Sequence, residues 1–227
     1  MSDLQKKNAG EAAAQYVEAG MVVGLGTGST AAWFVKALAA RNLSDLRCVP
    51  TSERTADLAR ELGLTLSTLE DTPKIDLTVD GADEIGPGLA LIKGGGAALL
   101  REKLVWEASA RCICIADAAK VVPALGTFPL PIEVVAFGHK TTANRIADVL
   151  ADHDIASPAR VREAERGLIR TDGGNLIYDA ACKLIADPAR LAADLKSLTG
   201  VVEHGLFLDL TDLAVIGTDE GFETINP

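Results

Sequence analysis

The chain has 227 residues, 48% of them hydrophobic, and a formal net charge of −10 at pH 7. This length and composition suit one large globular domain, or one domain with a smaller second one. The acidic balance argues against a nucleic-acid surface, because neutralising phosphates requires clustered lysines and arginines. No apolar run approaches the roughly 18 residues of a membrane span, and the N-terminal segment lacks the apolar core of a signal peptide. We therefore expect a cytoplasmic protein that binds neither nucleic acid nor membrane.

The cysteines and histidines predict neither a metal site nor a disulfide framework. The four cysteines are scattered without disulfide or zinc spacing, and Cys112 and Cys114 alternate inside an apolar run as small core residues would. His139, His153 and His204 are far apart, so we expect neither a histidine metal site nor a Ser-His-Asp triad. Any chemistry must come from carboxylates, lysines and backbone.

The N-terminal third begins with a helix and then a glycine-rich turn. Apolar residues recur at helical spacing over 3–19, and Gly20 is a stop signal. The segment MVVGLGTGST reads as a short strand and a turn, followed by a helix over 30–40. This order presents backbone N–H groups and a helix dipole to an anion. The turn offers glycines for close approach and hydroxyl donors: Gly24, Gly26 and Gly28, with Thr27, Ser29 and Thr30.

The glycine spacing decides which anion this turn would hold. It matches neither the Walker-type nucleotide loop nor the dinucleotide fingerprint, and no aspartate ends the following strand. A single phosphoryl group on a small molecule fits better. The alternative is a glycine turn without any ligand.

Strands and helices then alternate along the chain. We predict strands over 46–49, 64–69 and 75–79, and a helix over 53–62 with Ser52 as its N-cap. This alternation indicates βαβ units, and hence a Rossmann-like, mostly parallel sheet with helices on both faces. Ligands of such sheets bind beyond the carboxyl ends of the strands, where the glycine turn and the segment after Val79 would both lie.

Two charged turns follow. Asp80 and Asp83 flank a glycine turn, where two carboxylates could share protons, orient sugar hydroxyls or hold a divalent metal. The alternative is an acidic turn with capping side chains, and we expect the adjacent Glu84 to be solvated. Lys93 opens the run Gly94–Gly96 before a helix, which suggests an oxyanion or phosphate environment rather than a surface lysine.

Glu102, on the helix that follows the glycine run, is an acidic residue among apolar neighbours. The residues three and four positions away on either side are all apolar: Ala98, Leu99, Val105 and Trp106. On this buried face, desolvation would raise the pKa of the glutamate towards neutrality. The alternative is a glutamate at the edge of the face, with its head in water. A poised glutamate and an anion-stabilising lysine suit proton abstraction next to a carbonyl, with charge developing on oxygen.

The second half of the chain predicts a small α+β domain. A buried strand over 111–117 leads to Lys120, and a strand, helix, strand, strand, helix, strand order follows over 131–204. This is the ferredoxin-like split βαβ order. We predict a main α/β domain of residues 1–128 and 205–227, a ferredoxin-like domain of residues 129–204 hinged near Pro129 and Pro131, and a return of 206–217 to the main sheet.

Four motifs, in this order, carry a resemblance to a known family: GLGTGST at 24–30, VDGADEI at 79–85, KGGGAALLREK at 93–103 and ICIADAAK at 113–120. Together with FPLPIEV, TDGGN and GLF they resemble ribose-5-phosphate isomerase of the A type over nearly the whole chain. The resemblance implies interconversion of D-ribose 5-phosphate and D-ribulose 5-phosphate in the pentose phosphate pathway, without metal or organic cofactor. It also implies a homodimer or homotetramer whose small domain acts as a lid.

The resemblance also assigns roles to residues. Glu102 would be the general base, Lys93 would stabilise the enediolate oxyanion, and Asp80 and Asp83 would bind the sugar hydroxyls, one of them opening the ring. The remaining substrate-binding or phosphate-binding residues would be Lys6, Thr27, Gly28, Ser29, Thr30, Gly81, Ala82, Gly94, Gly95, Gly96 and Lys120. One departure is Gly173 in TDGGN, where the family has TDNGN.

Two other classes of protein compete with this interpretation. A sugar-phosphate-sensing domain would carry a similar glycine loop but would need no poised base. A relative of acyl-CoA transferases would use a glutamate as nucleophile on a larger substrate, and would need a longer chain than 227 residues.

Overall fold

The computed structural model describes residues 3–165 and 167–227. The chain divides into two compact units. The first unit comprises the chain up to Ala82 together with Arg101–Val121 and Asp209–Pro227, and the second comprises Asp83–Leu100 and Val122–Leu208. These bounds differ from those of the predicted domains, mainly because 83–100 packs with the second unit. The domain division itself stays a prediction.

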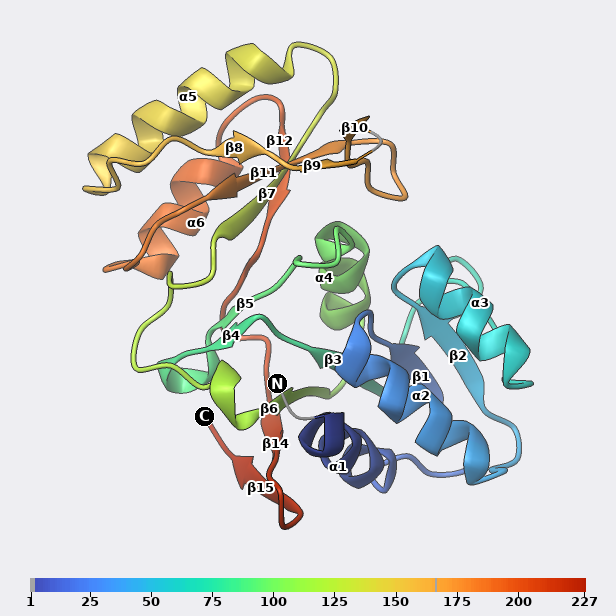
Figure 1. Cartoon of the computed structure of the whole chain (residues 1–227). Helices are drawn as coiled ribbons and strands as arrows, with labels where there is room; N and C mark the ends of the chain where they lie inside the picture. Colours follow the sequence, from blue (N-terminus) through green and yellow to red (C-terminus); the bar gives the residue numbers. More distant parts are fainter. Residues whose placement is uncertain (1–2, 166) are drawn as a thin grey trace. The chain divides into compact units, whose positions relative to one another are not determined.

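The first unit is built on a six-stranded sheet with the order β15-β14-β6-β3-β1-β2 (Figure 1). Its strands are β1 (Val22–Leu25), β2 (Arg47–Pro50), β3 (Leu77–Gly81), β6 (Cys112–Asp117), β14 (Leu213–Gly217) and β15 (Phe222–Ile225). Every neighbouring pair is parallel except β14 and β15, which form an antiparallel hairpin at the edge. The predicted mostly parallel, Rossmann-like sheet is confirmed.

Helices cover both faces of this sheet, as the alternation predicts. The helices are α1 (Asp3–Ala14), α2 (Ser29–Ala40), α3 (Glu53–Glu61) and α4 (Leu99–Glu107), the last belonging to this unit from Arg101 on. Val23 and Leu25 of β1 join the apolar cluster formed with α1 and α2. Val22 instead packs with Val105 of α4, because successive side chains of a strand point to opposite faces.

The first helix is shorter than the predicted 3–19. The amides of Gln15, Tyr16 and Val17 bond back to carbonyls three residues earlier, which tightens the chain out of α-helical geometry. Arg41 closes this end, because its guanidinium donates to the carbonyl oxygens of Ala14 and, at 2.6 Å, of Val17. Arg41 is the C-cap residue of α2, so the sequence around the first helix does not reveal this contact.

Two predicted strands also change. The segment 64–69 forms only one bridge, Leu66 with Cys48, at the edge beyond β2. The segment 206–217 divides at Asp209, whose positive φ of 55° turns the chain. Only β14 joins the parallel sheet, so the return of the whole segment to that sheet is wrong.

The second unit contains the ferredoxin-like arrangement. Its four-stranded sheet has the order β12-β7-β11-β8, with all pairs antiparallel (Figure 1). The elements in chain order are β7 (Leu130–Val134), α5 (His139–Asp152), β8 (Arg160–Val161), β11 (Leu176–Ala180), α6 (Pro188–Lys196) and β12 (Val201–His204). Ile146 and Leu150 of α5 and Leu191 and Leu195 of α6 pack on this sheet in one cluster. The split βαβ order predicted from the sequence is confirmed.

Two smaller sheets complete the second unit. One is three-stranded in the order β13-β5-β4, and the other is a hairpin. Their strands are β4 (Glu84–Ile85), β5 (Leu91–Ile92) and β13 (Leu206–Phe207), and β9 (Glu163–Ala164) with β10 (Gly167–Leu168). Because β4 and β5 are antiparallel, with Glu84 opposite Ile92, the acidic turn before β4 and the lysine after β5 lie at the same end of this sheet. None of the described helices is both long and apolar enough to cross a membrane.

Candidate active site

The loops that follow three parallel strands lie at one edge of the sheet of the first unit. Strands β1, β3 and β6 are neighbours and run parallel, so their carboxyl ends meet at the same edge. The glycine turn follows β1, Asp80 is the last residue but one of β3, and the short 3-10 helix Ala118–Lys120 follows β6. The structure therefore brings Asp80, the glycine turn and Lys120 together, as the parallel topology predicts.

The glycine turn is built directly on Asp80. A Cβ at Gly26 would lie 2.2 Å from Oδ1 of Asp80 and 2.5 Å from its Cα, so only glycine allows this approach. Oδ1 of Asp80 accepts hydrogen bonds from the backbone N–H groups of Thr27 at 2.9 Å and Gly81 at 2.7 Å. Asp80 is fully buried. Its carboxylate thus holds the turns after β1 and β3 in one arrangement.

The hydroxyl of Thr27 faces a buried cluster of hydroxyl groups. Oγ1 of Thr27 lies 2.7 Å from Oγ1 of Thr51, 2.8 Å from Oγ of Ser52 and 3.2 Å from Oγ1 of Thr55. Oγ1 of Thr55 also donates to the carbonyl oxygen of Gly26 at 3.0 Å. These hydrogen bonds hold the glycine turn on its buried side. Ser29 is exposed and Thr30 is partly exposed, so their hydroxyl groups are the ones that lie toward solvent.

Lys6 is brought to the first residue of α2. Its Nζ donates to Oγ of Ser29 at 2.9 Å. The contact follows from the docking of α1, because Asn8 donates to the carbonyl oxygen of Thr218 at 2.8 Å, beyond the end of β14. The lysine therefore adds positive charge at a helix N-terminus that already favours anions. Local sequence alone would make Lys6 an ordinary surface residue.

Glu102 lies in the first turn of α4 and is 3% exposed. The prediction that it occupies the buried face of this helix is confirmed, since Val105 and Trp106 are also buried. The preceding residue, Arg101, points elsewhere: its Nη1 lies 2.8 Å from Oε1 of Glu53. That hydrogen bond, and then the charge of Arg101, lower the pKa of Glu53.

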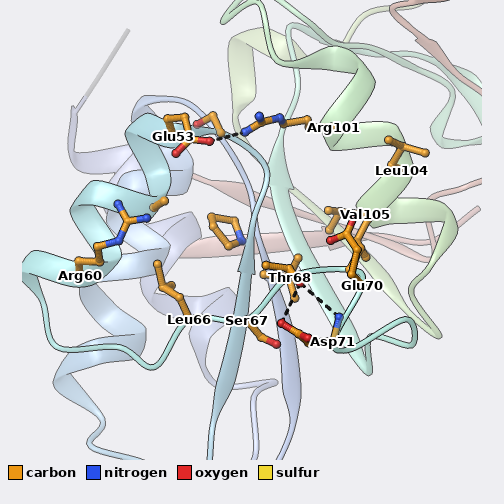
Figure 2. Close-up of a pocket in the computed structure, with 15 residues that line it drawn as sticks. Glu53, Arg60, Leu66, Ser67, Thr68, Glu70, Asp71, Arg101, Leu104 and Val105 are labelled. Atoms are coloured by element: carbon orange, nitrogen blue, oxygen red, sulfur yellow. Dashed lines mark hydrogen bonds and ion pairs between the residues drawn. The ribbon is translucent and has the colours of Figure 1, made fainter. Parts of the chain in front are cut away.

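A hollow of about 510 Å³ lies beside α4, on the side of β2 and α3. Figure 2 shows Arg101, Leu104 and Val105 of α4 along it, with the Arg101–Glu53 ion pair at its upper edge. None of the residues that line it is among the predicted site residues. Helix α4 thus has one flank along this hollow, while Glu102 itself is not part of the lining.

In the second unit, Asp83 is tied to the glycine run that follows Lys93. Its Oδ2 accepts a hydrogen bond of 2.7 Å from the N–H of Gly95, and its own N–H donates to the carbonyl oxygen of Ile92 at 2.8 Å. A Cβ at Gly95 would meet Oδ1 of Asp83 at 2.6 Å. Gly94 has a φ of +104°, which side chains rarely adopt. The structure therefore places Asp83 against Gly94–Gly96.

Lys93 is a buried lysine, 2% exposed. Its backbone N–H donates to the carbonyl oxygen of Gly205 at 2.8 Å, which extends the three-stranded sheet by one residue. Its Nζ lies 5.4 Å from the centroid of the Phe207 ring, within the range of a cation–π contact. Burying an ammonium group is costly, so this position is atypical of a lysine that serves only solubility.

Glu84 is not solvated, and that expectation is wrong. The side chain is 3% exposed, and its two carboxylate oxygens accept from the N–H groups of Gly126 at 2.7 Å and Phe128 at 2.5 Å. Its partners lie more than forty residues further along the chain, where no local pattern connects them with the acidic turn. Glu84 holds the entry segment of the ferredoxin-like sheet and belongs to the scaffold.

Two of the histidines bond to side chains of the second unit, and the cysteines are buried. His139 lies 2.6 Å from the Tyr178 hydroxyl, and His153 lies 2.9 Å from Oδ2 of Asp194. All four cysteines are buried. Within the described part of the chain, no group of three or more His, Cys, Asp or Glu side chains is arranged to hold a metal ion.

Arg162 also binds the glycine run, and no sequence pattern indicates this contact. Arg162 donates to the carbonyl oxygens of Gly94 and Gly95, and it pairs with Asp179. It lies in the charged stretch ARVREAER, which has the composition of a solvated surface.

The fold and these groups define a class: an α/β enzyme with a phosphate-type loop at the carboxyl edge of a parallel sheet, a buried glutamate and a buried lysine. The family model described as Ribose 5-phosphate isomerase A (phosphoriboisomerase A) matches residues 47–221. The ribose-5-phosphate isomerase A of Caulobacter vibrioides (strain NA1000 / CB15N) is 70% identical over 226 residues, which is 100% of this chain and 99% of that protein.

Solved structures agree with this match. The ribose 5-phosphate isomerase of Plasmodium falciparum superimposes with a TM-score of 0.93 at 37% identity, covering 100% of this chain and 99% of that one. A D-ribose-5-phosphate isomerase in complex with phospho-erythronic acid gives a TM-score of 0.91 at 37% identity, with 98% of both chains covered. The chain belongs to the ribose 5-phosphate isomerase A family, and it is an isomerase.

Proposed function

We propose that this chain interconverts D-ribose 5-phosphate and D-ribulose 5-phosphate through an enediolate, with Glu102 as the general base. The observation that carries the proposal is the burial of Glu102 on α4 in a chain that matches the isomerase family over its whole length. A buried carboxylate is poorly solvated and holds a proton more readily than an exposed one, so it can accept and return one near neutral pH. Glu102 would move the proton between C1 and C2.

The phosphate would bind at the N-terminus of α2. The backbone N–H groups of Gly28, Ser29 and Thr30 and the helix dipole favour an anion there. Lys6, which donates a hydrogen bond to Ser29, and Lys120, which follows β6 at the same edge of the sheet, would add positive charge. Thr27 would contribute by shaping the turn, since its hydroxyl faces the buried hydroxyl cluster and its N–H donates to Asp80.

The two aspartates would have different tasks. Asp80 is fully buried and holds the N–H groups of Thr27 and Gly81, which suits a role in shaping the turn that binds the sugar hydroxyls. Asp83 is only partly buried, and we assign ring opening to it. Lys93 and the N–H groups of Gly94–Gly96 would stabilise the oxyanion of the enediolate, and the turn at Gly81 and Ala82 would contact the sugar.

The wider context follows from the same proposal. The enzyme would work in the cytoplasm, in the pentose phosphate pathway, as a homodimer or homotetramer and without a metal or organic cofactor. Light scattering on the purified protein would distinguish a dimer from a tetramer. Activity that survives a chelator would support a metal-free reaction, and activity lost to the chelator would instead assign Asp80 and Asp83 to a metal.

The direct test is isomerisation of ribose 5-phosphate by the wild type and by Glu102→Gln, with a chelator present. The variant keeps the size of the side chain and removes its basicity, so we expect turnover to fall by about 10³-fold or more while the substrate still binds. Tight binding without turnover in both proteins would contradict the proposal and favour a sugar-phosphate sensor. Full activity in Glu102→Gln would remove this glutamate from the mechanism.

A further inference from the structure

Arg162 binds the backbone of the glycine run that follows Lys93. Its Nη1 donates to the carbonyl oxygen of Gly94 at 2.9 Å and to that of Gly95 at 3.1 Å. The rest of the guanidinium group faces Asp179, with Nε and Nη2 donating to the two carboxylate oxygens at 2.8 and 2.5 Å. The side chain of Arg162 is only 14% exposed. A bidentate pair of this kind fixes the plane of the guanidinium group, and hence the direction of its remaining donors.

The carbonyl contacts determine where the N–H groups of the same peptides point. In a planar trans peptide the C=O and N–H bonds are directed to opposite sides. The peptide between Gly94 and Gly95 has its oxygen on Arg162 and its N–H on Oδ2 of Asp83, at 2.7 Å. The next peptide also has its oxygen on Arg162, so the N–H of Gly96 is directed away from the arginine.

Such a fixed direction is not a property of three consecutive glycines. Glycine samples more backbone conformations than any other residue, and a run of three would leave the peptide dipoles free to rotate. Donors stabilise a developing negative charge well only when they are already oriented before the reaction. The carbonyl of Gly94 also accepts from the N–H of Ala97 at 3.0 Å, whereas Arg162 holds the carbonyls of both Gly94 and Gly95 and so fixes two successive peptides.

We propose that Arg162, oriented by Asp179, is a positioning residue for the isomerase. It directs the N–H groups of Gly95 and Gly96 to the side opposite the guanidinium, where Gly95 holds Asp83 and Gly96 faces the oxyanion of the enediolate. This inference rests on the proposed function of the glycine run. Arg162 itself touches backbone and Asp179, and acts on the sugar only through the peptides that it holds.

The test compares Arg162→Gln with a matched control, Arg170→Gln. Arg170 lies in the same unit and also donates to a glycine carbonyl, that of Gly174 at 2.8 Å, so each variant loses one charge and its contacts with glycine carbonyls, two in Arg162→Gln and one in the control. We expect kcat for ribose 5-phosphate to fall about 10- to 100-fold in Arg162→Gln, since removing an oriented donor costs about 10² to 10³. KM should change by less than about threefold, because the phosphate contacts are untouched. The control should keep both constants.

A binding measurement separates positioning from general loosening of the unit. The probes are 4-phospho-D-erythronate, whose carboxylate imitates the charge of the enediolate, and a phosphorylated alditol of the same length, which has no such charge. Calorimetry should show that Arg162→Gln weakens the binding of the phosphoerythronate at least ten times more than the binding of the alditol phosphate. This factor is roughly the contribution of one oriented donor to oxyanion stabilisation. Equal weakening of both probes would contradict the proposal.

Two further variants keep the test decisive if Arg162→Gln does not fold. Arg162→Lys keeps the charge, but its three donors on one nitrogen cannot replace the four hydrogen bonds of the planar guanidinium group. Asp179→Asn keeps the arginine but loosens its orientation. Both variants should have a lower kcat than the wild type, with a smaller decrease than in Arg162→Gln. Unchanged kcat in folded variants, with an active wild type, would overturn the role of Arg162 and leave the isomerase activity standing. An inactive wild type would instead contradict the proposed function.

Discussion

Two equally buried glutamates of this protein differ in the groups around them. Glu102 and Glu84 are both 3% exposed, but Glu84 accepts two backbone hydrogen bonds from the 126–128 segment and is part of the scaffold. Glu102 lies on a helix whose neighbouring positions are apolar. The burial of Glu102 could be predicted because helical spacing is local, and that of Glu84 could not, because its partners are distant in the chain.

Replacing Glu84 by alanine should cost stability and leave the chemistry intact. The change strands the N–H groups of Gly126 and Phe128 inside the second unit, which we expect to cost about 2 to 4 kcal/mol of unfolding free energy. Urea unfolding measures this, with the exposed Glu61→Ala as control at about 0.5 kcal/mol or less. If Glu84→Ala were as stable as the control, the two hydrogen bonds of this carboxylate would not contribute to the stability of the fold.

At the scale of elements, the cap of α3 also supports the glycine turn. Oγ of Ser52 accepts from the N–H of Thr55 at 3.1 Å, as predicted from the sequence. The same oxygen lies 2.8 Å from Oγ1 of Thr27, which no sequence pattern indicates because the two are joined only by the parallel pairing of β1 and β2. One hydroxyl therefore connects a helix start with the turn proposed to bind phosphate.

This double contact predicts a double effect for Ser52→Ala. Loss of the cap should cost about 1 to 2 kcal/mol, and Asp187→Ala, which removes the cap of α6, should cost about the same. Only Ser52→Ala should also raise KM for the sugar phosphate, because Thr27 and its turn lose a support. If both variants raise KM equally, or neither does, the hydroxyl cluster has no part in phosphate binding.

The elements themselves were largely predictable from local signals. The strand–helix alternation and the split βαβ order follow from periodicity and from glycine and proline positions. The six-stranded sheet is mostly parallel and the four-stranded sheet has the ferredoxin-like order, as predicted. The end of α1 at Ala14 was not predictable, since Arg41 closes it from the next helix. The same limit applies to Arg162, whose partners Gly94 and Gly95 lie 68 and 67 residues away.

At the scale of the whole molecule, buried thiols make stability depend on pH in the alkaline range. Burial raises the pKa of the Cys48 thiol to about 12 and that of Cys182 to about 11, from an ordinary value of 9.0. Above pH 9 the unfolded chain releases these protons while the folded chain keeps them. Stability should therefore fall as pH rises from about 9 to about 11, by at most about 1.4 kcal/mol per pH unit for each thiol.

A double variant isolates this contribution from other alkaline titrations. Urea unfolding of Cys48→Ala/Cys182→Ala should give a lower stability at pH 8, because two buried side chains are shortened, but a flatter decline between pH 9 and 10 than the wild type. The same decline in both proteins would show that these thiols ionise equally in the folded and unfolded chains.

The central claim is that this isomerase moves a proton through an enediolate by means of Glu102. The most direct measurement is the conversion of ribose 5-phosphate in deuterated water, followed by nuclear magnetic resonance at C1 of the ribulose 5-phosphate formed. We predict solvent deuterium at this carbon with the wild type and no conversion above background with Glu102→Gln. Conversion by the wild type without any solvent deuterium at C1, or conversion by Glu102→Gln at the wild-type rate, would contradict the account.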